Sequence, residues 1–240
     1  MTFIDCNASI GEVLYNKFPL VNPTLDNQLS LMRRYGISRA LCSSGFCLPF
    51  DIDYGNELMS QWGREYRGIL PVFTAAPESF TPFNNAKAMK IYPKIMNYCL
   101  SSLHVGGICA QAAEKNLPVL LQFGQTDMRE LMALLSDFPG VNFIVTEFYY
   151  RNLRNLCPLL ENYKNFYVEI SFLKTFGALE FLCERFGAGR LVFGTGSPYY
   201  GAGASIAMVL CAEISQDDKE LIAHGNIELL CHLEVSDHDD

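Results

Sequence analysis

The sequence predicts an α/β fold of a single domain, the (β/α)8 or TIM barrel. Eight short apolar runs bounded by turn residues alternate with amphipathic segments along the 240 residues. Continuous apolar strands of this kind are typical of a parallel sheet whose outer face is covered by helices. The length fits as well, because one such barrel commonly fills about 250 residues.

The chain opens on the first of these strands, Thr2–Cys6, an apolar run that carries Asp5 and precedes a predicted turn at 7–11 with small polar side chains. Such a strand delivers its last side chains to one end of a sheet. The other seven predicted strands cover 39–45, 68–74, 88–93, 118–124, 142–147, 165–171 and 190–196.

Helix signals fall between these strands. A helix is predicted over 24–35, because Asn22-Pro23-Thr24 is a start signal and Gly36 a stop signal. The acidic segment 236–240 is expected to be a frayed tail, which leaves 1–235 to the barrel domain. The other predicted helices cover about 53–66, 102–115, 128–136 and 217–230, with further ones between the later strands.

The structural alternative is an open, doubly wound sheet. That fold would favour a Gly-x-Gly-x-x-Gly turn after the first strand, and Cys6–Gly11 does not have this pattern. Eight strands in alternation with helices therefore favour the closed barrel.

The composition excludes several classes of partner and location. A net charge of −8 without a basic stripe argues against nucleic acid. The nine cysteines form no Cys-x-x-Cys pair and several lie in apolar runs, which favours free thiols in a reducing cytosol. No leader and no apolar stretch of about 18 residues is seen, so we expect a cytoplasmic protein without a membrane partner.

Five segments together resemble a known family. Phe193–Pro198, for example, reads Phe-Gly-Thr-Gly-Ser-Pro where the family has Phe-Gly-Thr-Asp-Ser-Pro. The chain resembles the amidohydrolase-related TIM-barrel group, the metal-dependent hydrolases and decarboxylases of the aminocarboxymuconate-semialdehyde decarboxylase type. The segments, in chain order, are Lys90–Pro93, Leu117–Gly124, Phe138–Glu147, Phe193–Pro198 and Gly225–Leu230.

The resemblance also indicates where a metal site would be. Family members hold a divalent metal with histidines from strands one, five and six and an aspartate from strand eight, and the aspartate also moves protons. None of the five positions keeps the family's residue in this chain. They are occupied by Asn7, Ser9, Gln122, Glu147 and Gly196.

This substitution pattern favours a degenerate member of the family, a pseudoenzyme without metal or other cofactor that acts as a binding or interaction protein. Its polar pocket would hold Asp5, Lys90 and the five replaced positions. An unknown small molecule, a second copy of the chain or an active paralogue are the partners it could have. The alternative is a divergent hydrolase or lyase that uses Glu147, Glu169 and Lys90 as catalytic residues.

Individual residues have structural interpretations beside the functional ones. Asp5 is expected to be a buried carboxylate satisfied by backbone or hydroxyl donors. Lys90 is expected to form an ion pair with Glu147 or Glu169 rather than to carry a carboxylated amine. The two glutamates, from neighbouring strands, could also form an acid/base pair.

Two further features stay open. The glycine-rich loop 194–203 could bind an anion through its backbone N–H groups, although a tight turn explains the glycines better. Aromatic residues near the predicted strand ends could line an apolar pocket or plug the barrel mouth. They are Phe46, Phe123, Phe148, Tyr149, Tyr150, Tyr199 and Tyr200.

Overall fold

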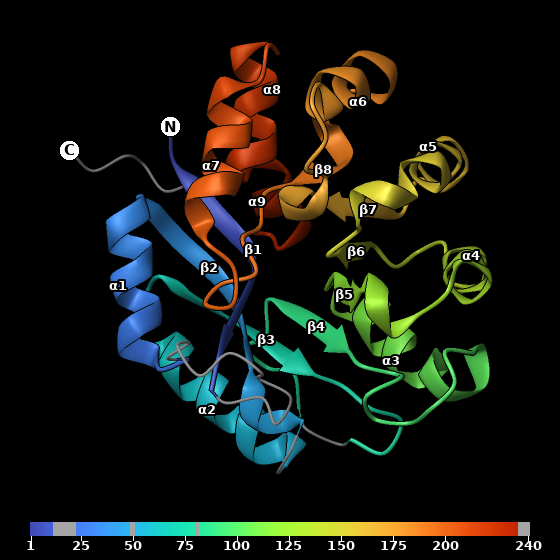
Figure 1. Ribbon diagram of the computed structural model, residues 1–240. Coiled ribbons are helices and arrows are strands. Elements are labelled where there is room, and N and C mark those ends of the chain that lie inside the picture. Colours follow the sequence, from blue (N-terminus) through green and yellow to red (C-terminus); the bar gives the residue numbers. More distant parts are fainter. Residues whose placement is uncertain (12–22, 49–50, 80–81, 235–240) are drawn as a thin grey trace.

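The computed structural model describes residues 1–11, 23–48, 51–79 and 82–234. Eight parallel strands follow one another around a single sheet in the order in which they occur in the chain, with helices outside them (Figure 1). The predicted (β/α)8 barrel is therefore confirmed. The strands are β1 (Phe3–Ile10), β2 (Ile37–Ser44), β3 (Ile69–Thr74), β4 (Ala88–Ile91), β5 (Val119–Gln122), β6 (Phe143–Thr146), β7 (Phe166–Glu169) and β8 (Leu191–Val192).

The helices cover the outer face of this sheet (Figure 1). The first helix has both predicted end signals: the Thr24 side chain accepts from Asn27 N, and Gly36 ends the helix in the left-handed conformation. The α-helices are α1 (Leu25–Tyr35), α2 (Ile52–Glu65), α3 (Ser102–Glu114), α4 (Met128–Asp137), α5 (Leu153–Asn162), α6 (Ala178–Phe186), α7 (Ala202–Cys211), α8 (Gln216–Glu220) and α9 (Asn226–Leu230).

Two predictions concern the C-terminal part of the chain. The helix predicted over 217–230 is confirmed as one continuous helical segment, in which a π-helical turn at Leu221–Gly225 joins α8 to α9. The predicted acidic tail at 236–240 lies outside the described residues. Within the described ranges, no helix combines the length and hydropathy that crossing a membrane requires.

The first strand differs most from its prediction. The predicted turn at 7–11 is wrong for residues 7–10, because β1 continues to Ile10. Asp5 pairs with Ala40 and Ala8 with Cys42, so three residues of β1 match two of β2, and the extra residue forms a bulge. A bulge reverses the alternation of side chains along a strand. Ile4 and Cys6 point toward the barrel interior, and strict alternation would next turn Ala8 and Ile10 inward. Because of the bulge, Asn7 and Ser9 point inward instead.

The barrel closes between β8 and β1. The backbone N–H of Cys6 donates to Phe193 O at 3.0 Å, Gly196 N donates to Asn7 O at 2.8 Å, and Ser9 N donates to Ser197 O at 2.9 Å. The predicted eighth strand, 190–196, is shorter in the structure, Leu191–Val192, and the segment after it stays hydrogen-bonded to β1. The loop after β8 is thus held directly against the first strand.

The interior is layered. Apolar side chains fill the part of the barrel that lies before the carboxyl ends of the strands. They include those of Leu41, Ala88, Leu120, Ile144 and Val192. Because alternate residues of a strand point to the same face, the residues two places further along these strands also point inward. All of these except Gly194, which follows Val192, are polar, and they form a layer at the carboxyl ends of the strands. They include Ser43, Lys90, Gln122, Thr146 and Glu169.

Candidate functional site at the carboxyl end of the barrel

The five positions of the expected metal centre all lie at this end of the barrel. Asn7 and Ser9 follow the bulge in β1, Gln122 ends β5, and Glu147 directly follows β6. Gly196 lies in the turn after β8, and its N–H donates to Asn7 O. Ser9, Gln122 and Glu147 are partly exposed, so solvent reaches the layer from the barrel mouth.

Lys90 lies beneath this opening and is 5% exposed. Its ammonium group donates to Asn7 Oδ1 at 3.3 Å and to Ser43 Oγ at 3.4 Å, and it lies 5.4 Å from the centre of the Tyr92 ring. The Ser43 hydroxyl is in turn 3.3 Å from that of Ser9. Lys90 thus connects β4 with β1 and β2 through neutral partners.

The ion pair predicted between Lys90 and Glu147 or Glu169 is wrong. In the described ranges no carboxylate oxygen lies within 4.0 Å of Lys90 Nζ, and the ion pairs found there join other residues. The physical reason is local: each glutamate is held on its own side of the barrel by another donor. The charge of Lys90 nevertheless acts on Glu147 over a longer distance and opposes the rise of its pKa.

The two glutamates are linked to each other through the backbone. Gln122 Nε2 donates to Glu147 Oε2 at 2.7 Å, and the backbone N–H of Glu147 donates to Glu169 Oε2 at 3.2 Å. Ser171 donates to Glu169 through both its N–H, at 2.5 Å, and its hydroxyl, at 2.9 Å. Glu147 has a positive φ of 55°, which non-glycine residues rarely adopt. The bond to Glu169 holds this conformation.

Burial raises the pKa of both carboxyl groups. Glu169 is completely buried, and desolvation raises its pKa to about 7, with the donors on Ser171 and Glu147 opposing the rise. Burial also raises the pKa of Glu147, against the Lys90 charge and the hydrogen bond from Gln122. Glu169 is engaged by its three donors, whereas Glu147 is partly exposed toward the mouth.

Asp5 has a structural environment. Its carboxylate accepts from Asn7 N at 2.9 Å, from Thr195 N at 3.0 Å and from the Thr195 hydroxyl. Thr195 Oγ1 in turn accepts from Ser197 N at 3.0 Å. Desolvation raises the pKa of Asp5, and these donors oppose the rise. Backbone and hydroxyl donors satisfy this buried carboxylate, as expected for a group that fastens the barrel seam.

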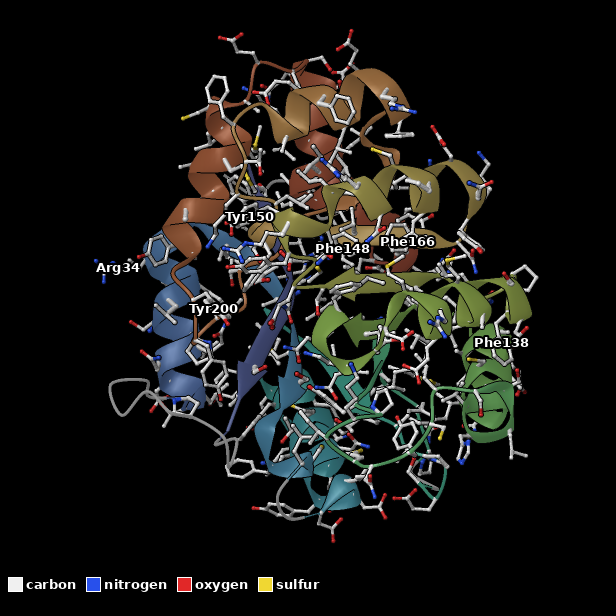
Figure 2. All side chains as sticks on the ribbon, turned by 45° about the vertical axis from the view of Figure 1, so that its right-hand side comes forward. Arg34, Phe138, Phe148, Tyr150, Phe166 and Tyr200 are labelled. Carbon is white, nitrogen blue, oxygen red and sulfur yellow. The ribbon has the colours of Figure 1, made fainter. Side chains whose placement is uncertain are left out.

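An aromatic ring lies against Gly196, the position at which the resemblance places the family's strand-eight aspartate. Gly196 has a φ of +69°, and a Cβ built on it would lie 2.6 Å from the ring of Tyr200. The ring centroid of Tyr200 is 4.9 Å from that of Phe172, and Phe172 is 6.0 Å from Tyr149. An aromatic row from three loops therefore lies over this side of the mouth, and Figure 2 labels Tyr200, the ring that contacts position 196.

The other predicted aromatic residues are divided between the mouth and the core. Phe148 is fully buried, 4.6 Å from Phe123 and 6.3 Å from Phe166 between ring centroids (Figure 2). These rings pack beneath the loop after β6. Tyr149, 43% exposed, lies outside this cluster.

In the first half of the glycine-rich loop, three successive backbone N–H groups are already hydrogen-bonded within the protein. Thr195 N donates to Asp5, Gly196 N to Asn7 O and Ser197 N to Thr195 Oγ1. The interpretation of this segment as an anion-binding loop is therefore wrong at these positions. The first glycine of the loop serves close packing, since a Cβ on Gly194 would lie 2.5 Å from the Glu169 side chain.

These residues do not fit a divalent metal. Metal binding requires converging imidazole, thiolate or carboxylate donors. The five positions offer one carboxylate, two amides, a hydroxyl and a glycine, and the ammonium of Lys90 bonds directly to one of the amides. In the described part of the chain, no three His, Cys, Asp or Glu side chains are grouped so that they could hold a metal ion.

The fold and the polar layer together identify the class of protein. It is a TIM barrel with polar side chains at the carboxyl ends of its strands. Residues 84–230 match the amidohydrolase family, and the chain belongs to this family. No curated protein sequence matches the chain.

Solved structures share the fold at low identity. An uncharacterized TIM-barrel protein from Bordetella bronchiseptica is 16% identical with a TM-score of 0.74, over 97% of this chain and 99% of its own. A 2,6-dihydroxybenzoate decarboxylase from Rhizobium is 12% identical with a TM-score of 0.72, over 97% and 99% of the two chains. A 5-carboxyvanillate decarboxylase from Novosphingobium aromaticivorans, solved with manganese, is 13% identical with a TM-score of 0.72, over 97% and 96%.

Sequence reasoning missed several members of the site. Ser43 lies on the inward face of β2 two residues after Leu41, and the strand pattern could have identified it. Thr146 could have been found on β6 in the same way. Ser171 and Phe172 follow β7 in a 3-10 turn, and no signal in the sequence pointed to their contacts with Glu169 and Tyr200.

Proposed function

We propose that this amidohydrolase-family barrel is a metal-free binding protein and not a metal-dependent hydrolase. One observation carries the proposal: the ammonium of Lys90 bonds to Asn7, which stands at a metal-ligand position of the family. A fixed positive charge at this place opposes a divalent cation. Without the metal, no bound water has its pKa lowered to supply a hydroxide nucleophile at neutral pH.

The ring of Tyr200 supports the same proposal. In the family, the strand-eight aspartate both binds metal and moves protons. Here position 196 is a glycine with positive φ, and Tyr200 fills the space that a side chain would need. An aspartate at position 196 would therefore clash with the packing of the loop, and we expect that Gly196→Asp alone would not create a metal site.

The test is a metal analysis of untagged protein produced in medium supplemented with zinc and manganese, followed by extensive dialysis. We expect far less than one metal ion per chain, and no hydrolysis of simple amides, esters or lactones. About one tightly bound zinc, manganese, iron or nickel ion per chain would refute the proposal.

A second candidate function is a divergent hydrolase or lyase that transfers protons without a metal. The observation that favours it is the pair Glu147 and Glu169, whose pKa values burial raises, that of Glu169 to about 7. Glu147, which is partly exposed, would be the catalytic acid or base, with Glu169 positioning its backbone and Lys90 available to an anionic substrate. This candidate predicts an activity that Glu147→Gln removes and Glu65→Gln, an exposed control, leaves intact.

The proposal extends to the location of the protein and to its partners. All nine cysteines are free thiols, which supports a reducing, cytoplasmic location. A small molecule at the barrel mouth is the partner that the polar layer supports. Size-exclusion chromatography with light scattering would distinguish a monomer from a homo-oligomer, and co-purification would test pairing with an active paralogue.

A further inference from the structure

The charge of Lys90 is incompletely compensated. The side chain is 5% exposed, and its two hydrogen bonds, at 3.3 Å and 3.4 Å, are long and go to a neutral amide and a neutral hydroxyl. Across the described part of the chain, no carboxylate lies within 4.0 Å of it. A buried ammonium group without a paired anion is costly, so an anion at this place would be favoured.

A second observation points to the same place. Asn7 is 4% exposed, and its Nδ2 has no hydrogen-bond acceptor among the described residues. The orientation of this amide follows from Lys90, because an ammonium group can only donate and must face Oδ1. The N–H donors of Nδ2 therefore lie beside the ammonium without an acceptor among the described residues. Buried N–H donors are nearly always satisfied, and a missing acceptor here indicates a ligand.

We propose that the barrel mouth binds a small carboxylate monoanion, which Lys90 Nζ and Asn7 Nδ2 hold together. Lys90 Nζ is hydrogen-bonded to Oδ1 of the same amide group that carries Nδ2. The two donors are therefore neighbours and match the two oxygens of one carboxylate. This inference rests on the metal-free site proposed above, since a divalent metal at the same positions would take the carboxylate itself.

The surrounding charges select a monoanion over a dianion such as phosphate. Asp5, Glu147 and Glu169 stand at the same end of the barrel. Burial raises the pKa of the Cys6 thiol, the charges of Glu169 and Asp5 raise it further, and the charge of Lys90 opposes this rise. One cation thus faces several acidic groups. It can balance a single added negative charge, whereas a second one would meet repulsion from the carboxylates.

The experiment titrates trifluoroacetate, the probe, with full-length protein that has been treated with a chelator. The measured quantity is the fluorine NMR line width of the probe. We expect line broadening that saturates with wild-type protein. Lys90→Met keeps the length of the side chain without its charge and should weaken binding by about tenfold or more. Lys94→Met, which changes an exposed lysine four residues later, should bind the probe as the wild type does.

Asn7→Asp is the second variant. The new carboxylate would lie against Lys90 and supply the missing anion inside the protein, so probe binding should be lost while the protein gains thermal stability. This variant keeps the proposal falsifiable if Lys90→Met fails to fold. Equal binding by wild type and Asn7→Asp, or no binding by the wild type, would overturn the proposal.

Metal content measured on the same samples separates the two proposals. Probe binding that requires added metal and is unchanged in Lys90→Met would refute the metal-free site. Metal-free protein that does not bind the probe would refute the carboxylate site alone and leave the first proposal standing.

Discussion

The carboxylate of Asp5 accepts hydrogen bonds from both the backbone N–H and the hydroxyl of Thr195, a residue 190 positions further along the chain. These bonds join the first strand to the segment after the last one, where the barrel closes. The residue that precedes the family's metal ligands thus holds the seam of this barrel. Its contribution to stability does not depend on any metal.

Asp5→Asn should therefore destabilise the fold. An asparagine offers one acceptor oxygen where the carboxylate offers two, and its amide donor would face groups that also donate. We expect a loss of about 2–3 kcal/mol in the free energy of unfolding, measured by urea denaturation. Glu114→Gln, at an exposed position of α3, is the control and should change it by less than about 0.5 kcal/mol.

Gly196 and Tyr200 should be energetically coupled. Gly196→Ala places a methyl group 2.6 Å from the Tyr200 ring at a φ of +69°, so we expect a loss of about 2–4 kcal/mol. In a Tyr200→Ala background the steric part disappears and about 1 kcal/mol of backbone cost remains. A double-mutant cycle measures this difference. Strictly additive effects would show that the ring does not confine position 196.

Glu169 should make stability depend on pH. Its pKa is about 7 in the folded protein against an ordinary value of 4.5, so the folded state binds more protons than the unfolded state between these values. Stability should then fall as pH rises through this window, by up to about 3 kcal/mol. Urea denaturation from pH 5 to pH 8 would measure this slope, and Glu169→Gln should flatten it. An unchanged slope in that variant would assign it to another group.

Asn226 should anchor α9 to the barrel. Its buried amide group donates to Ala188 O and to Leu191 O, both at 2.8 Å. Asn226→Ala removes both donors and leaves two carbonyl groups unsatisfied, at a cost of about 2–3 kcal/mol. Asn226→Asp should cost more, because it turns carboxylate oxygens toward the same carbonyls. Thermal unfolding of the three proteins gives the order, and equal midpoints would contradict this role.

Much of the fold was determined by the sequence alone. Eight apolar runs in alternation with helices specify a parallel barrel, because each strand must bury both faces and each connection must cross the outside. The same strand ends identified most of the polar layer. The sequence also predicts that the family's metal ligands are replaced at Asn7, Gln122 and Gly196, because this prediction needs only the chemistry of the side chains.

The tertiary structure decided how these residues act together. The bulge in β1, which turns Asn7 and Ser9 inward, depends on the register with β2 and has no signature in the strand itself. The partners of Lys90 are neutral, against the predicted ion pair, because Gln122 and Ser171 hold the glutamates elsewhere. Distances between side chains from different strands come from the closure of the barrel. Local sequence patterns do not contain them.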